Sequence, residues 1–373
     1  MDTNCFKLTG RLLLGLSSML VSGQFPAWSQ TAPSPQVQSP GTELSTNAEA
    51  ADTHERAFRR HVSELFRQGQ YAELDALATQ LQSQQLRFRG GAWQLNEFYG
   101  LISYPGSLTA TDAEWQARIA KLGEWAKAYP ASPTPRVAMA QAYLYFAWKA
   151  RGNGMGDTVT AVGGAQFDER AESARKILES AAKLSVHCPA WYVVMGTVAL
   201  AQGWPRAQVD KLVEAALTNA PGYYYFATGH ANYLLPKWYG KPGETEEFAE
   251  QAANRTGGDE GNIEYFMIAA RINCCGKTQA PGLAWPRVQQ GFAALDRHYG
   301  TTNHEHNMMA YLALRAGDKE TAQQLFARIG DNWDESVWRS KARFDASRTG
   351  QVVGRTKPVG VYTPSAGSSE ANK

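Results

Sequence analysis

Apolar positions recur at helical spacing through most of the chain. In the first such run Val62, Leu65 and Phe66 lie on one face of a helix, and a second amphipathic run follows the break at Gly69. Apolar residues at i, i+3, i+4 and i+7 are typical of amphipathic helices, and no long alternation of β-branched residues predicts a strand. We therefore predict an all-α domain over residues 52–348, with about fourteen or fifteen helices in antiparallel pairs.

Polar signals predict where individual helices begin and end. The phrases D-x-x-E from Asp52 and T-x-x-E from Thr111 have the form of a capping box. Residues 244–256 place acidic side chains first and a basic one near the end, which complements the helix dipole. We also predict a last helix over 333–344 and a long glycine-rich loop over 151–167.

The clearest internal repeat lies within residues 189–240. Pro189 aligns with Pro221 at an offset of about 32 residues, close to the roughly 34-residue period of tetratricopeptide helix pairs. The predicted architecture is a tetratricopeptide-like α–α superhelix of stacked antiparallel helix pairs. The phrase L-P-K-W-Y-G at 235–240 has no counterpart in the first copy, which makes it the first place to look for function.

Several phrases together resemble a bacterial domain-of-unknown-function family with a tetratricopeptide-like helical-repeat build. They are L-F-x-x-G-x-Y-x-x-L-D at 65–75, R-F-R-G-G-x-W at 87–93, R-G-x-G-x-x-D-T-V at 151–159, L-P-K-W-Y-G at 235–240, A-G-D-K-E-T-A at 316–322 and F-x-x-I-G-D-x-W-D-x-x-V-W at 326–338. The resemblance implies a helical-repeat fold, and the family carries no established activity. Tyr239 stands where glycine is commoner in that family.

The N-terminus has the composition of a secretory signal peptide. Two basic residues precede an apolar run over residues 12–21, and the small residues Ala27 and Ser29 follow. The run is well short of the roughly 20 apolar residues that a membrane-spanning helix needs. We predict a signal peptide over 1–29, which makes the mature chain periplasmic or secreted and leaves it without a transmembrane segment. An uncleaved N-terminal helix is the alternative.

Composition adds two expectations about the rest of the chain. Residues 30–51 and 349–373 are rich in Pro, Ser, Gly and other small or polar residues, so we predict a flexible linker and a disordered tail. The net charge is only +2 and basic residues are scattered, whereas nucleic-acid-binding domains carry a clustered basic face. We therefore expect no nucleic-acid partner.

The cysteines predict a structural disulfide. Removal of the signal peptide leaves Cys188, Cys274 and Cys275. Three thiols in an oxidising compartment allow one intramolecular bridge. Their spacing matches no zinc motif, so we interpret them as a structural staple. The predicted bridge joins Cys188 to Cys275, with Cys274 as the alternative partner and a strained Cys274–Cys275 ring as the less favoured third pairing.

Two patterns that superficially suggest ligand chemistry receive a structural interpretation. Histidines at 304 and 306 are the most metal-like pair, but on a helix they diverge by about 200°, so we interpret them as a polar helix start. The glycines within 152–156 lack the Gly-Lys-Ser/Thr of a phosphate loop. We predict no metal and no cofactor. The glycine-rich loop remains a possible binding loop, with Arg151 and Asp157 as polar contacts.

Aromatic residues are concentrated in the second repeat copy. Successive side chains on a helix are about 100° apart, so the three tyrosines at 223–225 cannot all face inward, and at least one should reach the surface. Exposed aromatics with a polar group suit peptide or sugar contact. The candidate partner-binding residues are Tyr223, Tyr224, His230, Asn232, Lys237, Trp238, Tyr239, Arg151 and Asp157.

These observations favour a non-enzymatic, exported α-solenoid that binds a protein or peptide partner on its concave face. The alternative is a cell-envelope hydrolase that acts on peptide or glycan, with carboxylates or His230 in an aromatic-lined groove. A third hypothesis is a small-ligand pocket beneath the glycine-rich loop. No G-x-S-x-G or thiol-protease phrase occurs in the sequence, which favours the binding role.

Overall fold

The computed structural model describes residues 43–350 except 108, 153–158, 185–187, 237 and 274–281, with side chains described from Thr53 onward. Within these residues all named elements are helices, and the single β-type pairing is an isolated bridge between Arg87 and Trp93. The predicted all-α class is therefore confirmed. In the same residues no helix is both long enough and apolar enough to cross a bilayer.

The helices follow one another along the chain with short connections. Their bounds are α1 Glu43–Gln68, α2 Tyr71–Ser83, η2 Arg89–Gly91, α3 Gln94–Ser103, α4 Asp112–Ala128, α5 Thr134–Arg151, α6 Ala161–Ala182, α7 Pro189–Ala201, α8 Arg206–Asn219, α9 Tyr225–Tyr233, α10 Glu244–Thr256, α11 Gly258–Asn273, α12 Trp285–Tyr299, α13 Asn303–Ala316, α14 Lys319–Ile329, α15 Glu335–Trp338 and α16 Lys341–Arg348.

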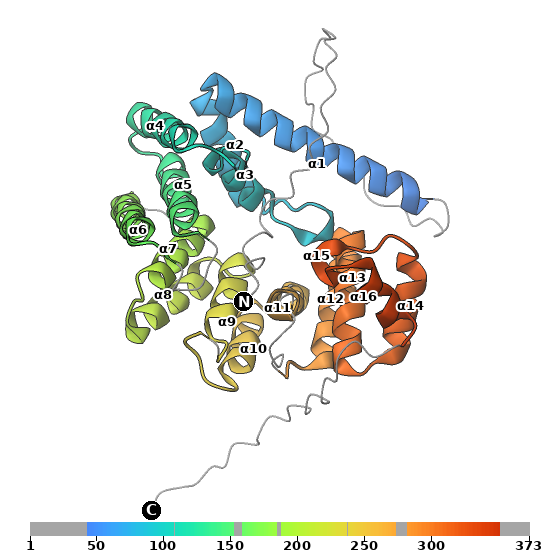
Figure 1. The fold of residues 1–373 in the computed structure, drawn as a ribbon. Helices are drawn as coiled ribbons and strands as arrows, with labels where there is room; N and C mark the ends of the chain where they lie inside the picture. The colour runs from blue at the N-terminus through green and yellow to red at the C-terminus, as the bar shows by residue number, and fades with distance from the viewer. Residues whose placement is uncertain are drawn as a thin grey trace, which may run out of the picture.

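Consecutive helices pack side by side and form a curved stack (Figure 1). The closest packing joins α5 to α6 and α11 to α12, and α11 also packs against α9. Alanines with no more than 4% exposure recur on many of these helices, and their small side chains allow neighbouring backbones to approach. One hydrophobic core runs through the whole stack, from α1 to α16.

A segment between α2 and α3 contacts the far end of the curved stack. We name residues 87–93 the clasp, because they reach helices far along the chain. The Gly90 N–H donates to the Gly300 carbonyl oxygen at 2.9 Å, and Arg89 Nε donates to the Thr301 carbonyl oxygen at 2.7 Å. Gly91 has φ 75°, a backbone conformation that favours glycine, and a Cβ there would lie 2.5 Å from Leu295 Cδ1 and displace that side chain.

One predicted helix start is confirmed and another is wrong. The Thr111 hydroxyl accepts from the Glu114 N–H while the Glu114 carboxylate accepts from the Thr111 N–H at 2.6 Å, which is the predicted capping box. In contrast, α1 begins at Glu43, so Asp52 lies inside a helix and does not start one. The predicted boundary between linker and domain, at residues 51 and 52, also lies within α1. The alanine-rich stretch before Asp52 has high helix propensity, which extends the helix upstream.

Two other boundaries also differ from prediction. Helix α6 begins at Ala161, where Thr160 caps it by accepting from the Gly163 N–H at 3.0 Å, so the glycine-rich loop is shorter than expected. The single last helix is instead two short ones, because Arg339 adopts φ 69° between α15 and α16. A left-handed residue interrupts the helical hydrogen-bond ladder at that point.

The repeat is preserved as helix pairs but not residue by residue. Helix α7 begins at Pro189, whereas α9 begins at Tyr225 rather than at the aligned Pro221. Gly222 has φ 74° and forms a turn that delays the start of α9. Tyr223 therefore lies outside the helix.

Candidate functional site

The clasp surrounds a buried arginine. The side chain of Arg87 is 3% exposed, and its guanidinium lies 3.2 Å from the Glu260 carboxylate of α11. The guanidinium carbon lies 3.4 Å from the centre of the Trp93 ring, an arrangement typical of a cation–π contact. Burial lowers the pKa of Arg87, and Glu260 opposes that change. The ion pair therefore holds the clasp against α11. Because the two charges neutralise each other, neither is available to bind a charged ligand.

The tyrosines at 223–225 complete this cluster instead of forming a surface. Tyr223 packs edge-on against Trp93 at 4.9 Å, and the Tyr224 hydroxyl donates to the Gly91 carbonyl oxygen at 3.2 Å. The Tyr225 hydroxyl accepts from the Trp93 N–H at 3.1 Å. Tyr223 and Tyr224 are buried and only Tyr225 keeps partial exposure, so the first two cannot be the predicted surface contacts. The helical argument failed because the turn holds Tyr223 and Tyr224 outside α9, which begins at Tyr225.

A buried carboxyl group lies next to the same turn. Glu264 of α11 is 2% exposed, and it accepts a hydrogen bond from the Thr256 hydroxyl at 2.6 Å. Thr256 Oγ1 in turn accepts from the Gly222 N–H at 3.0 Å. Burial raises the pKa of Glu264 to about 7, which the Thr256 bond partly offsets. A substrate would reach this carboxyl only if the helices separated. We therefore interpret Glu264 as a structural group of the turn and not as a catalytic one.

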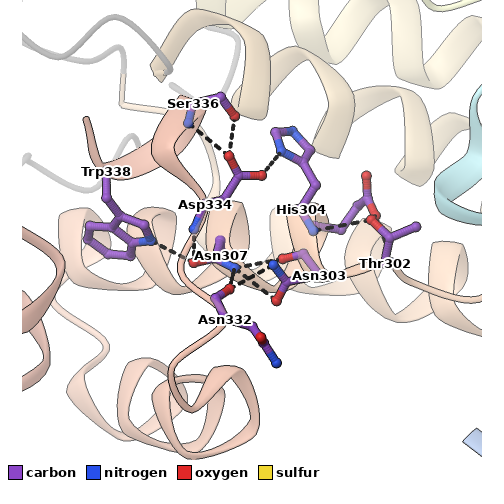
Figure 2. Close-up of polar contacts among 9 residues, drawn as sticks. Thr302, Asn303, His304, Asn307, Asn332, Asp334, Ser336 and Trp338 are labelled. Carbon is purple, nitrogen blue, oxygen red and sulfur yellow. Dashed lines mark hydrogen bonds and ion pairs between the residues drawn. The ribbon is translucent and has the colours of Figure 1, made fainter. Parts of the chain in front are cut away.

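A second buried polar network ties α13 to the chain before α15 (Figure 2). Asn307 is fully buried, and its Oδ1 accepts from Trp338 Nε1 at 2.8 Å and from the Asp334 N–H at 3.2 Å. Its Nδ2 donates to the carbonyl oxygens of Asn303 at 2.8 Å and Asn332 at 3.1 Å. One amide thus joins three segments of the chain.

Asp334 forms a pair with His304 that resembles part of a catalytic triad without its geometry. Asp334 Oδ2 lies 2.8 Å from His304 Nδ1, while Oδ1 accepts from the Ser336 hydroxyl at 2.6 Å (Figure 2). In a triad the serine hydroxyl bonds to the imidazole, which takes its proton. Here the serine and the imidazole bind opposite oxygens of one carboxylate. The arrangement caps α15 and does not activate a nucleophile.

The two histidines of the H-E-H phrase go to different partners. His304 binds Asp334, whereas His306 Nε2 lies 2.9 Å from the Thr301 hydroxyl and its ring packs edge-on against Phe292. Glu305 between them accepts from the backbone of the helix start, at Thr302. Among the described residues no three metal-ligating side chains converge. The phrase serves as the polar helix start that its spacing predicts.

The surface feature that stands out lies on the turn from α9 to α10. Trp238 is 53% exposed and Tyr239 is 52% exposed, in contrast to most large aromatics of the chain. The Tyr239 ring stacks on Tyr233 at 4.8 Å, and Tyr233 stacks on the buried His230 at 5.4 Å. His230 stacks in turn on Phe226, at 6.2 Å. We call Trp238 and Tyr239 the aromatic edge. We call the stacked rings of Tyr233, His230 and Phe226 the ladder.

Backbone geometry holds the aromatic edge in place. The Tyr239 N–H donates to the Tyr233 carbonyl oxygen at 3.2 Å, and the Trp238 N–H donates to the Leu235 carbonyl oxygen at 2.8 Å. A Cβ at Gly240 would lie 1.8 Å from the Leu234 carbonyl oxygen, so no other residue fits this turn. Both exposed residues thus lie on a closed turn, and the Tyr239 ring also rests on a stacked base, which lowers the entropy lost when a partner covers them.

The structure separates the predicted binding residues. Trp238 and Tyr239 are exposed and Asn232 is partly buried beside them, but His230 is 8% exposed and serves as a rung of the ladder. Burial lowers the pKa of His230 to about 4, which keeps its ring neutral. Arg151 lies at the end of α5, on a different helix pair. The predicted contacts at 157 and 237 lie outside the described residues.

Cys188 is buried at the start of α7 and contacts Tyr99. Its sulfur lies 3.2 Å from the Tyr99 hydroxyl, and it forms no disulfide with any described residue. Both predicted partners, Cys274 and Cys275, lie outside the described residues, so the staple stays a prediction.

The ladder and the clasp were not predicted as units. Phe226, His230 and Tyr233 recur at helical spacing, so a search for aromatic rings at i, i+4 and i+7 would have found the ladder. Nothing local marks the clasp, whose partners at 260 and 301 are far along the chain. In comparisons with family models, curated proteins and solved structures, no significant match to this chain was found.

Proposed function

We propose that this chain is an exported helical-repeat protein that binds a protein or peptide partner at the aromatic edge. The observation that carries the proposal is the exposure of Trp238 and Tyr239 on a turn that their backbone and Gly240 hold closed. Tryptophan and tyrosine are enriched among the residues that dominate binding energy at protein interfaces. Covering two half-exposed rings would contribute on the order of 2 kcal/mol.

Charged residues beside the ladder support a protein partner. Arg206 of α8 lies 2.7 Å from Asp210 and 3.3 Å from Glu244 at the start of α10. Burial raises the pKa of Tyr233, and Arg206 and Glu244 also act on it, so these charges flank the ladder. An apolar centre with a polar, hydrated rim is the usual anatomy of a protein interface.

The contacts of the clasp favour the aromatic edge, and not the interior of the curved stack, as the partner-binding site. Trp93 contacts Tyr223 before α9, Arg87 contacts Glu260 of α11, and Gly91 lies against Leu295 of α12. The clasp thus fills part of the space between α3 and the helices from α9 to α12. The aromatic edge lies outside this occupied region, on the turn between α9 and α10.

A crosslinking experiment tests the binding half of the proposal. A photoreactive amino acid replaces Trp238 or Tyr239 in the full chain, expressed in the cells that naturally make it, and Val162 serves as the control position. Val162 is 68% exposed on α6, so it matches the edge in being apolar and accessible. We expect one discrete adduct of the same mass from both edge positions and none from the control. Equal adducts at all three positions, or none from a folded chain, would refute the edge as a partner site.

Export is tested separately. The protein is recovered from the cytoplasm and from outside the inner membrane, and its N-terminal sequence is determined. Recovery outside the cytoplasm with an N-terminus at Gln30 supports export and cleavage, whereas cytoplasmic protein that retains residues 1–29 contradicts it.

A further inference from the structure

A pocket of about 470 Å³ lies where α2, the turn from α4 to α5 and the start of α7 meet. Its lining includes Asp75 and Thr79 of α2, Tyr99 of α3, Tyr129 and Thr134 of the turn, and Cys188. Binding sites for small molecules typically have volumes of roughly 300–1,000 Å³, and this pocket falls in that range. It lies on different helices from the aromatic edge, so it is independent of the proposed partner site.

The pocket contains one acidic group and no described basic one. The Asp75 carboxylate is half-buried, and its Oδ1 accepts from the Ser132 hydroxyl at 2.7 Å. Burial raises the pKa of Asp75, and hydrogen bonds from Ser132, Trp125 and Thr134 partly offset that rise. None of the lining residues that the structure describes is Lys, Arg or His.

Two other carboxylates that contact buried parts of the chain have a basic partner, whereas the buried Glu264 forms no ion pair with a described residue and is held by the Thr256 hydroxyl. Glu260 meets the buried Arg87 at 3.2 Å, and Asp334 meets His304 at 2.8 Å. Asp75 forms no ion pair with any described residue, although a carboxylate removed from water favours a cation beside it. The pocket thus leaves a charge that a ligand could neutralise.

The rest of the lining suits an apolar body. At the base the Tyr99 hydroxyl and the Cys188 sulfur lie 3.2 Å apart and are nearly inaccessible, so they satisfy each other. Tyr129 is 36% exposed and is followed by proline and alanine in the turn. An aromatic face of this kind also attracts a cation.

We propose that this pocket binds a small organic cation, with an ammonium group against the Asp75 carboxylate and an apolar body against the turn that begins at Tyr129. The ammonium adds a charged donor to a carboxylate that so far has only neutral donors, and the Ser132 bond orients that carboxylate. An ammonium group of this kind can belong to a free amine or to the amino terminus of a peptide.

Ligand-observed NMR titrations of the full chain test this proposal. Phenethylamine is the charged probe and 2-phenylethanol is its neutral counterpart of similar shape. A hydrogen bond to a charged group contributes about 1.5–3 kcal/mol, so we expect the amine to bind about tenfold more tightly or better. The dipeptide amide Ala-Phe-NH2 then distinguishes the two sources. If the natural ligand is a peptide amino terminus, this dipeptide binds more tightly than phenethylamine, and its N-acetyl form, which lacks the ammonium group, loses that affinity. If the natural ligand is a free amine, phenethylamine binds at least as tightly as the dipeptide.

Asp75→Asn tests the role of the carboxylate, because asparagine keeps an oxygen that can accept from Ser132. Glu73→Gln is the matched control, since Glu73 is exposed on the same helix and does not line the pocket. We expect Asp75→Asn to remove the preference for the amine and Glu73→Gln to retain it, with both variants unfolding at temperatures close to wild type. Equal binding of amine and alcohol by wild type, no binding of either, or an unchanged preference in Asp75→Asn would each overturn the proposal.

Discussion

The amide of Asn307 gives the most demanding test of how the C-terminal helices are held together. It is fully buried and makes five hydrogen bonds. Its Oδ1 accepts two, and its Nδ2 donates to the carbonyl oxygens of Asn303 and Asn332 and to Asn303 Oδ1. In Asn307→Ala the Trp338 indole N–H loses its partner inside the core, where Trp338 is 1% exposed. The Asp334 N–H loses its partner as well.

The magnitude follows from these stranded groups. A buried donor or acceptor left without a partner costs about 1–3 kcal/mol, so the two stranded donors together should cost about 2–6 kcal/mol of unfolding free energy. The Asn332 carbonyl adds little, because Asn332 is exposed and water replaces the lost bond. Asn303→Ala is the control, since Asn303 is exposed and donates one side-chain bond to that same carbonyl at 2.7 Å. Asn303 Oδ1 also accepts from Asn307 Nδ2 at 3.2 Å, but Nδ2 keeps its two carbonyl partners in this variant. We expect it to cost less than about 1 kcal/mol.

Urea denaturation followed by circular dichroism measures both variants. Hydrogen exchange of α13 and α15 shows whether the loss is local, which matters because repeat arrays can unfold in parts. Faster exchange in α15 with little change in α7 is the expected pattern. If Asn307→Ala and Asn303→Ala differ by less than about 0.5 kcal/mol, then the network does not stabilise the fold as we argue.

Three further substitutions give results of different sign. Gly240→Ala should lower the free energy of unfolding by about 1–3 kcal/mol and abolish the crosslink at the aromatic edge, because the new Cβ would overlap the Leu234 carbonyl oxygen. A variant as stable as wild type would refute the closed turn. Glu264 has a folded pKa near 7 against a usual 4.5, so its stabilising effect is present below pH 4.5 and is lost as pH rises through 7. That loss is about 3 kcal/mol, and Glu264→Gln should flatten the pH dependence of urea stability over this interval, while an unchanged slope would contradict the assignment. Tyr223→Phe should be neutral or stabilising by about 1 kcal/mol, since the buried Tyr223 hydroxyl has no hydrogen-bond partner, and a thermal-melt loss above that size would indicate a missed one.

Local signals in the sequence predicted the helices well. The capping box at Thr111 and the acidic start of α10 act within one helical turn, so their physics is readable from neighbouring residues. The start of α1 was placed too late because a polar, alanine-rich stretch serves equally as linker and as helix. Composition alone does not distinguish these outcomes.

The sites depend on contacts that span the chain, which explains why they were harder to predict. The exposure of Trp238 and Tyr239 agrees with the departure of their phrase from the repeat. Tyr224 was misplaced because its environment is set by the clasp, far upstream in the sequence. The pocket at Asp75 combines residues of α2, the turn after α4 and the start of α7, and no single stretch of sequence contains it.

The clasp also changes what kind of folding unit this chain is. In an open repeat array each helix pair touches only its neighbours, so the ends can fray while the middle stays folded. Here Arg89 and Gly90 bond to residues 301 and 300, which joins the segment between α2 and α3 to the segment between α12 and α13. Opening the array between those points requires the clasp to release first. Loss of structure in the intervening helices is therefore coupled, and the arc between α3 and α12 behaves as one cooperative unit instead of a series of separable hairpins.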